Sequence, residues 1–408
     1  MMHWSEYKFS DFVEINPKVP LKKGLEYSFV EMKDLSEGNK FVAPSQKRAL
    51  TGGSRFENGD TLFARITPCL ENGKICQVQN LENGIGFGST EFLVFRGKKG
   101  VSDSNFVHYL SLSDEVRGFA EQNMVGTSGR QRVSWQVFEN LVLTLPDLPT
   151  QTAIAEILSS IDDKIELNNK INQELENLAQ TLFKQWFIDF EFPNENGEPY
   201  KSSGGEMVES ELGEIPEGWS FGTLKDEFNL NMGQSPKGDT YNETGDGMIF
   251  FQGRSDFGFR YPSVRMFTKD PKKVAKKFET LISVRAPVGD INMVEYDCCI
   301  GRGLGSISHS RKLFSYTYYK ILSIQEELKS YDNEGTVFGS INKETLGNIK
   351  TIIPPLTISC GFDDLVKGKD QLIYNLTNQN QQLTNLRDTL LPKLISGELE
   401  VSQIKTTS

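Results

Sequence analysis

The sequence predicts an α+β protein in which two mixed α/β domains are separated by an intramolecular antiparallel two-helix coiled coil, arranged as a pseudo-twofold repeat. Three observations lead to this fold class. The two halves of the 408-residue chain end with the same pattern, each ending has apolar residues at heptad spacing, and short alternating strand patterns precede both endings. An internal repeat decides the architecture before any local assignment is made.

The repeat has a constant offset of 208 residues. Pro146 corresponds to Pro354 and Asn177 to Asn385, and the apolar positions between them match without a gap. A gapless match over a whole helix is hard to produce by chance. We therefore expect one globular domain followed by one long helix, made twice.

Each repeated segment predicts a helix whose apolar seam advances in steps of three and four residues. The predicted seam of the first helix comprises Ile154, Ile157, Ile161, Lys164, Asn168, Ile171, Leu175, Leu178, Leu182 and Gln185. The predicted seam of the second comprises Phe362, Leu365, Lys369, Leu372, Leu376, Gln379, Leu383, Leu386 and Leu390. Polar seam residues lower stability but can fix the register. Independent surface helices or a homodimeric zipper are the alternatives, and matched lengths within one chain favour mutual antiparallel pairing.

Both domains are expected to contain short strands and one longer helix. In the first domain, strands are predicted at residues 61–66, 74–78 and 90–95. A helix over 105–122 follows, with Asp103 or Ser104 as its cap. In the second domain, 280–287 corresponds to the first of these strands and 313–331 to the helix.

Glycine-rich segments lie between strand and helix in both domains, at 84–88 and 301–305. Neither has the spacing of a phosphate-binding loop at a strand-to-helix turn. We interpret them as bends or bulges beside a surface site.

Composition favours a cytoplasmic protein without a membrane segment, because no long apolar run and no signal-peptide pattern occur. Five cysteines without metal-like spacing indicate reduced thiols. The net charge of −11 is concentrated within residues 149–217, whereas residues 219–320 carry 15 basic and 11 acidic groups. Local positive surfaces that attract a polyanion therefore remain possible on the domains.

A second shared signature follows the predicted helix of each domain. The first copy is VGTSGRQRV at 125–133 and the second is EGTVFGSIN at 334–342. Each leads into an apolar strand and then a proline two residues before a leucine, Pro146 with Leu148 and Pro354 with Leu356. LGEIPEGW at 212–219 precedes the second domain, and LLPKLISGEL at 390–399 ends the second helix. Together these motifs resemble the specificity subunit of a type I restriction-modification system. Residues 357–361 depart from the family pattern, which commonly places a glutamine at the start of this helix, as Gln151 does in the first copy.

The resemblance implies a division of the chain into six parts. These are target-recognition domain 1 at 1–147, spacer helix 1 at 148–192, an acidic linker at 193–217, target-recognition domain 2 at 218–354, spacer helix 2 at 355–396 and a tail at 397–408. Each recognition domain would read one half of a bipartite DNA sequence, and the paired helices would set the spacing and dock methyltransferase subunits. The implied partners are double-stranded DNA, two methyltransferase subunits and restriction or motor subunits.

No catalytic motif is found in the sequence. There is no G-K-[ST] phosphate loop and no Asn-Pro-Pro-aromatic or Asp-Pro-Pro methylation motif, and residues 16–19 are best explained as a turn or strand end. We therefore expect a non-catalytic subunit, and the resemblance implies that S-adenosylmethionine, ATP and Mg bind to its partners. The complex would act as an adenine-specific methyltransferase and, with motor subunits, as an ATP-dependent endonuclease. The alternatives are a coiled-coil scaffold that binds only protein and a stand-alone enzyme with duplicated catalytic domains, and a DNA-binding assay separates all three.

Candidate DNA contacts are long polar side chains in segments expected at the domain surface, since Arg reads guanine and Gln or Asn reads adenine in the major groove, while Lys contacts phosphate. In the first domain they are Gln46, Lys47, Arg48, Arg65, Lys74, Thr127, Arg130 and Arg132. In the second they are Gln252, Arg254, Lys272, Lys273, Lys276, Lys277, Arg285, Arg302, Asn342 and Lys343. A structural salt bridge or loop anchor is the competing role for each.

Overall fold

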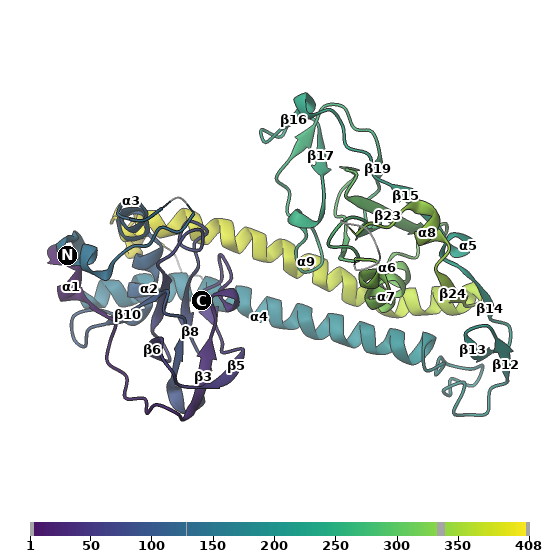
Figure 1. Cartoon of the computed structure of the whole chain (residues 1–408), viewed down its shortest axis with the longest axis horizontal. Coiled ribbons are helices and arrows are strands. Elements are labelled where there is room, and N and C mark those ends of the chain that lie inside the picture. The colour runs from purple at the N-terminus through teal and green to yellow at the C-terminus, as the bar shows by residue number, and fades with distance from the viewer. Residues whose placement is uncertain (1–3, 128, 333–338, 405–408) are drawn as a thin grey trace. The chain divides into compact units, whose positions relative to one another are not determined.

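The computed structural model describes residues 4–127, 129–332 and 339–404. The chain forms two compact units. Unit 1 comprises residues 1–170 and 376–408, and unit 2 comprises residues 171–375. Each unit therefore contains one globular domain and one half of each long helix (Figure 1).

The domain of unit 1 is built on two larger sheets. The five-stranded sheet has the order β2 (Val13–Ile15), β10 (Phe92–Gly97), β7 (Thr61–Ala64), β8 (Ile75–Val78) and β4 (Phe41–Val42). The four-stranded sheet has the order β5 (Gln46–Ala49), β3 (Glu26–Val30), β9 (Ile85–Gly88) and β6 (Ser54–Glu57). Side chains of β7 alternate between two cores: Phe63 packs against α2 (Ser104–Leu112), and Leu62 packs against the four-stranded sheet. The strands predicted in this domain are confirmed.

The helix predicted at 105–122 is wrong as a single element. Asp103 does cap it, because its side chain accepts a hydrogen bond from the Phe106 N–H at 2.9 Å. However, α2 ends at Leu112 because Ser113 has extended backbone angles. A π-helical turn at Asp114–Gly118 then leads into α3 (Phe119–Gln122). A short α1 (Phe9–Phe12) lies near the start of the domain.

Unit 2 repeats this layering. Its four-stranded sheet has the order β15 (Phe228–Met232), β23 (Leu304–His309), β20 (Thr280–Ser283) and β21 (Ile291–Met293). Its five-stranded sheet has the order β16 (Tyr241–Asn242), β18 (Phe267–Thr268), β17 (Met248–Phe251), β22 (Cys298–Ile300) and β19 (Val274–Ala275). In β20, Ile282 faces the core beneath the helices and Leu281 faces the second sheet, as Phe63 and Leu62 do in β7.

The predicted helix at 313–331 is also divided, into α6 (Phe314–Ser323) and α7 (Gln325–Ser330). The break occurs at Ile324, whose backbone leaves the helical region. Unit 2 further contains α5 (Leu224–Glu227), α8 (Lys343–Gly347) and the hairpin of β12 (Met207–Ser210) with β13 (Gly213–Pro216).

Each domain closes through a pair formed by its first and last strands. In unit 1, β1 (Trp4–Lys8) pairs antiparallel with β11 (Val142–Pro146). In unit 2, β14 (Ser220–Thr223) pairs in the same way with β24 (Lys350–Ile353). In both units the last strand leads directly into a long helix, so the closing pair fixes where that helix leaves the domain.

The long helices are α4 (Leu148–Phe187) and α9 (Leu356–Ile395), and they pair antiparallel within each unit. In unit 1 the start of α4 shares a core with the end of α9, where Ile154 lies with Leu394. In unit 2, Phe183 of α4 packs against Phe362 of α9 at 5.5 Å between ring centroids. The predicted intramolecular antiparallel pairing is therefore confirmed.

A polar contact fixes the register of the pair in unit 1. Asn168 is fully buried, and its side-chain amide donates to Gln379 Oε1 and Asn380 Oδ1, each at 2.8 Å. The predicted seam contained both Asn168 and Gln379. Because shifting either helix by one turn would leave this buried amide without its partners, the contact selects a single alignment.

The strict heptad seam is wrong over much of its length. Leu178, Leu365, Leu372 and Leu386 are exposed, and Lys164 and Gln185 are exposed as well. Buried positions instead recur every eleven residues, as in Ile161, Asn172 and Phe183, or in Ile165, Glu176 and Phe187. Eleven residues make three turns at about 3.67 residues per turn, close to a straight helix. Each long helix is covered by the domain of its unit in addition to the other long helix. The buried positions therefore follow the period of a straight helix and not that of a coiled-coil seam.

Among the described residues, no helix is long and apolar enough to cross a membrane.

Candidate nucleic-acid interface

A tethered loop displays two of the candidate arginines in unit 1. Val125 and Arg132 exchange backbone hydrogen bonds of 2.9 Å in both directions, and Val133 N–H donates to the Arg65 carbonyl at 2.9 Å. Gly126 makes the turn possible, because a Cβ there would lie 2.8 Å from the Arg130 carbonyl oxygen. The loop thus has a fixed base beside Arg65.

Arg130 and Arg132 differ in their partners. Arg132 forms a fork with Glu91, with its Nε and Nη2 each donating to Oε1 at 2.9 and 2.8 Å. Arg130 is exposed, and its side chain has no hydrogen-bond or ion-pair partner among the residues that the structure describes. Thr127 is also exposed in this loop, whereas its neighbour Ser128 lies outside the described residues. Arg130 is therefore the free guanidinium and Arg132 the anchored one.

Arg65 lines a surface cavity of about 790 Å³ in the same unit. Lys18 and Arg55 line it too, and neither is among the candidates predicted from the sequence. The Arg55 guanidinium donates to the carbonyls of Val19 and Leu21 at 3.2 and 3.3 Å, so it braces the segment that bears Lys18. Residues 16–19, predicted from the sequence to be a turn or strand end, also line this cavity.

The other candidates of unit 1 gather around residues 31–34 and the edge strand β5. Arg48 is ion-paired with Glu31 and lies over the Phe29 ring at 4.3 Å. Lys74 Nζ donates to the Met32 carbonyl at 3.1 Å. Lys47 pairs with Glu82 at 2.8 Å, and Gln46 begins the strand. Most of these side chains already have structural partners.

In unit 2 the glycine-rich segment brings two candidates together. A Cβ on Gly301 would lie 2.9 Å from the Gln252 Cα, and one on Gly303 would lie 2.8 Å from the Gln252 carbonyl oxygen. Only glycine permits this backbone approach, which places Arg302 beside Gln252. Both side chains are exposed and lack polar partners among the described residues.

The other candidates of unit 2 near the domain surface also divide into side chains with a polar partner and side chains without one. Arg254 is ion-paired with Asp290, whereas Arg285 is exposed at the end of its strand without a side-chain partner in the described part of the chain. Asn342 caps α8, because its Oδ1 accepts from Thr345 N–H at 2.9 Å. Lys343 follows on the exposed first turn. The signature residues 334–338 lie outside the described residues.

The lysine cluster at 272–277 is only partly free. Lys272 pairs with Asp270 at 2.6 Å and Lys276 with Asp297 at 2.7 Å. Lys277 lies over the rings of Phe278 and Tyr374, at 4.7 and 5.1 Å. Lys273 is exposed, with no side-chain partner among the described residues. Its ammonium is the most available of the four among the residues that the structure describes.

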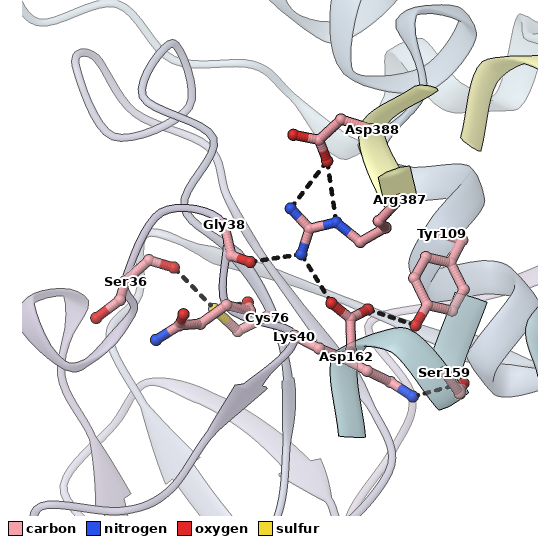
Figure 2. A network of polar contacts seen from close by, with 10 residues as sticks. Ser36, Gly38, Lys40, Cys76, Tyr109, Ser159, Asp162, Arg387 and Asp388 are labelled. Atoms are coloured by element: carbon pink, nitrogen blue, oxygen red, sulfur yellow. Dashed lines mark hydrogen bonds and ion pairs between the residues drawn. The ribbon is translucent and has the colours of Figure 1, made fainter. Parts of the chain in front are cut away.

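A buried polar network in unit 1 was not anticipated from the sequence (Figure 2). Arg387 of α9 donates to Asp162 Oδ1 of α4 at 2.7 Å and to the Gly38 carbonyl at 2.6 Å, and Tyr109 of α2 donates to Asp162 Oδ2 at 2.5 Å. We call Arg387, Asp162 and Tyr109 the first clasp. It joins both helices to the domain.

Burial lowers the pKa of two titratable side chains beside this network, Lys40 and His108. Lys40 donates to Ser159 at 2.7 Å (Figure 2), and burial lowers its pKa. Burial, assisted by Lys40 and Arg387, lowers the pKa of His108 to about 3. Among the described residues there is no His, Cys, Asp or Glu group suited to a metal ion.

Comparison with known proteins shows the family to which the chain belongs. A family model described as the type I restriction modification DNA specificity domain matches residues 1–177 and 216–384. A Methanocaldococcus jannaschii protein, provisionally named the type I restriction enzyme MjaX specificity subunit, is 31% identical and is matched over 84% of this chain and 79% of its own length. The HindI specificity subunit of Haemophilus influenzae is 26% identical, over 98% of this chain and 100% of its own.

A crystal structure of the S subunit of a type I restriction-modification system from M. genitalium shares the fold, with a TM-score of 0.54 at 17% identity. That likeness covers 97% of this chain and 96% of the other. The family model and the relatives confirm the resemblance drawn from the motifs. The chain therefore belongs to the type I restriction-modification DNA specificity family, as a specificity subunit that provides DNA sequence specificity.

Proposed function

We propose that this specificity subunit reads a bipartite target in double-stranded DNA, with one half-site for residues 1–147 and the other for 218–354. The observation that carries this proposal is the repeated unit, in which a two-sheet domain closes through its first and last strands and continues into a long helix. A protein with two similar domains places two recognition surfaces on one duplex. Residues 148–192 and 355–396 would be the spacer, 193–217 the linker and 397–408 the tail.

The free side chains of each domain are the strongest candidates for base contacts. Arg130 in domain 1, and Gln252, Arg285 and Arg302 in domain 2, are exposed and have no polar side-chain partner among the described residues. They can reach guanine or adenine edges without first breaking an ion pair. Lys273 is proposed as a phosphate contact.

The ion-paired candidates would contribute differently. Arg132, Lys47, Lys272 and Lys276 would have to exchange a carboxylate for a phosphate, so each gains less free energy on binding than a free side chain does. Asn342 is engaged as a helix cap, so its amide is the weakest base-reading candidate. These residues are proposed to support the recognition loops rather than to read bases.

The exposed leucines of the long helices support a docking role. Leu167 and Leu386 in unit 1, and Leu178, Leu365 and Leu372 in unit 2, are between 42% and 50% exposed. Apolar side chains that recur along an exposed helix face indicate a protein interface. We propose that two methyltransferase subunits dock here, and that restriction or motor subunits join the complex through them.

Chemistry would reside on those partners. The specificity subunit is non-catalytic within its family, and we propose that S-adenosylmethionine, ATP and Mg bind to the partner subunits. The assembled complex would then methylate adenine and, with motor subunits, cleave DNA. We propose that the complex acts in the cytoplasm.

Sequencing of methylated bases in cells that express this chain with its methyltransferase subunits tests the proposal. We expect two short defined sequences separated by a constant number of unspecified base pairs. Exchanging residues 1–147 for the matching domain of a relative with another target should change one half-site only. A single continuous motif, or an exchange that altered both half-sites, would contradict independent reading by the two domains. Failure of the assembled complex to bind DNA would favour the scaffold alternative.

A further inference from the structure

In unit 2, one arginine of the recognition domain lies between the two long helices. Arg260, in the loop before β18, is 1% exposed. Its Nη2 lies 2.6 Å from Glu176 Oε2 of α4 and 2.9 Å from Asp370 Oδ1 of α9. A single guanidinium therefore pairs with carboxylates from both helices.

Aromatic residues of α6 complete this contact. The Arg260 Nη2 donates to the Tyr319 hydroxyl at 2.5 Å, and that hydroxyl donates to Asp370 at 2.9 Å. The guanidinium also lies over the Tyr318 ring at 3.8 Å. We call Arg260, Glu176, Asp370 and Tyr319 the second clasp. It joins a domain loop, the main helix of the domain and both long helices at one point.

The two clasps are related by the internal repeat, but their arginines are not. Asp370 is Asp162 moved by the offset of 208 residues, and a tyrosine of the domain binds each of these carboxylates. The same offset places Ala179 where Arg387 would correspond. Ala179 is fully buried and has no group to donate. The positive charge is supplied by the helix in the first clasp and by the recognition domain in the second.

This difference gives Arg260 a role in placing the domain. Without it, the buried carboxylate of Glu176 and the partly buried carboxylate of Asp370 would lose the cation that pairs with both, which is strongly unfavourable. The loop is therefore tied to one position on the helix pair. We propose that Arg260 is a positioning residue that fixes the second recognition domain on the helices, and thereby the length of the gap accepted between half-sites. This inference rests on the proposed bipartite reading.

The gap length is a sensitive readout of such positioning. One added base pair rotates the second half-site by about a tenth of a turn of the duplex and moves it by about 3.4 Å along the axis. A domain held by the second clasp should reject this displacement, whereas a loosened domain should follow it. Base preference within the half-site depends on other loops of the domain and should not change.

The test compares Arg260→Met with wild type in the full chain, assembled with its methyltransferase subunits. One DNA library keeps both half-sites and varies the gap, and a second keeps the gap and randomises the second half-site. We expect the preference for the native gap to fall by about tenfold, with the base preference unchanged. Arg265→Met is the matched control, because Arg265 lies in the same loop and pairs with Asp256, which belongs to neither long helix. It should alter neither profile.

A further variant covers the case in which Arg260→Met does not fold. Combining Arg260→Met with Glu176→Gln and Asp370→Asn removes all three charges together, so no buried charge is left without a partner. This variant should show the same loss of gap preference. A native gap profile in either folded variant would overturn the inference, as would a loss of base preference equal to the loss of gap preference. A wild-type complex without any fixed gap would instead contradict the proposed function.

Discussion

The first clasp predicts that removing one charge destabilises unit 1 more than removing two. The side chains of Arg387 and Asp162 are only 7% and 4% exposed. In Arg387→Met, the Asp162 carboxylate keeps, among the described residues, the hydrogen bond from Tyr109 and the weaker attraction of Lys40, but it loses its ion-pair partner. Unfolding should therefore become easier by about 3–5 kcal/mol. In the double variant with Asp162→Asn no charge is left uncompensated, and the cost should fall to about 1–3 kcal/mol.

The single variant Asp162→Asn completes the cycle. It leaves Arg387 with the Gly38 carbonyl and Asp388, so we expect a loss of about 1.5–3 kcal/mol. The two single losses together, about 4.5–8 kcal/mol, exceed the loss in the double variant, and the difference, about 1.5–7 kcal/mol, is the coupling free energy of the pair.

Hydrogen exchange in the full chain measures these losses, because it reports the amides of unit 1 separately from those of unit 2. Lys170→Met is the matched control: Lys170 pairs with Glu166 on the exposed side of α4 within the same unit. That change should have little effect. Strict additivity of the two single losses would refute the reasoning, since it would mean that Asp162 is not left uncompensated when Arg387 is absent.

Three further predictions follow from single side chains. The pKa of His108 is lowered from its ordinary 6.5 to about 3, so the unfolded chain binds this proton at a higher pH than the folded chain does. The stability of unit 1 should therefore fall by about 1.4 kcal/mol per pH unit as the pH drops below about 6.5. His108→Leu should flatten this dependence in hydrogen exchange measured against pH. Lys273→Ala should reduce the slope of log affinity against log salt by about 0.9, whereas Lys276→Ala, with its partner Asp297, should reduce it by less in the same titration. Arg130→Ala should reduce the base preference at one position of the first half-site by about 1–3 kcal/mol in a selection from randomised DNA. Arg117 of the same domain is paired with Glu121, so Arg117→Ala should leave the base preference unchanged.

The features that sequence predicted well are those encoded by local pattern or by the repeat. The strand at 61–64 alternates between two cores, and that alternation is visible as a period of two. Asn168 interrupts an apolar seam, and a buried amide at such a position needs a partner on the facing helix, which Gln379 provides. The offset of 208 residues is a property of the letters alone.

The features that it missed depend on tertiary contact. Leu178 and Leu365 match a heptad, but the domains share in covering the helices and turn the buried stripe away from them. The helix predicted from 105 continues in propensity through Ser113, yet the backbone there is extended. Nothing in the local sequence separates Arg130 from Arg132, because the difference is the position of Glu91, which comes from another strand end.

In the two clasps, the tyrosine and the aspartate occupy corresponding elements of the two halves, whereas the arginine does not. Each domain presents a tyrosine to a carboxylate on a helix, and these two pairs keep their places in both halves of the chain. The buried carboxylate imposes a requirement for a positive charge, but any guanidinium that reaches it satisfies that requirement. Arg387 does so from the helix and Arg260 from the domain. A domain placed at 218–354 from another protein must therefore bring its own arginine, whereas one placed at 1–147 finds Arg387 already on the helix.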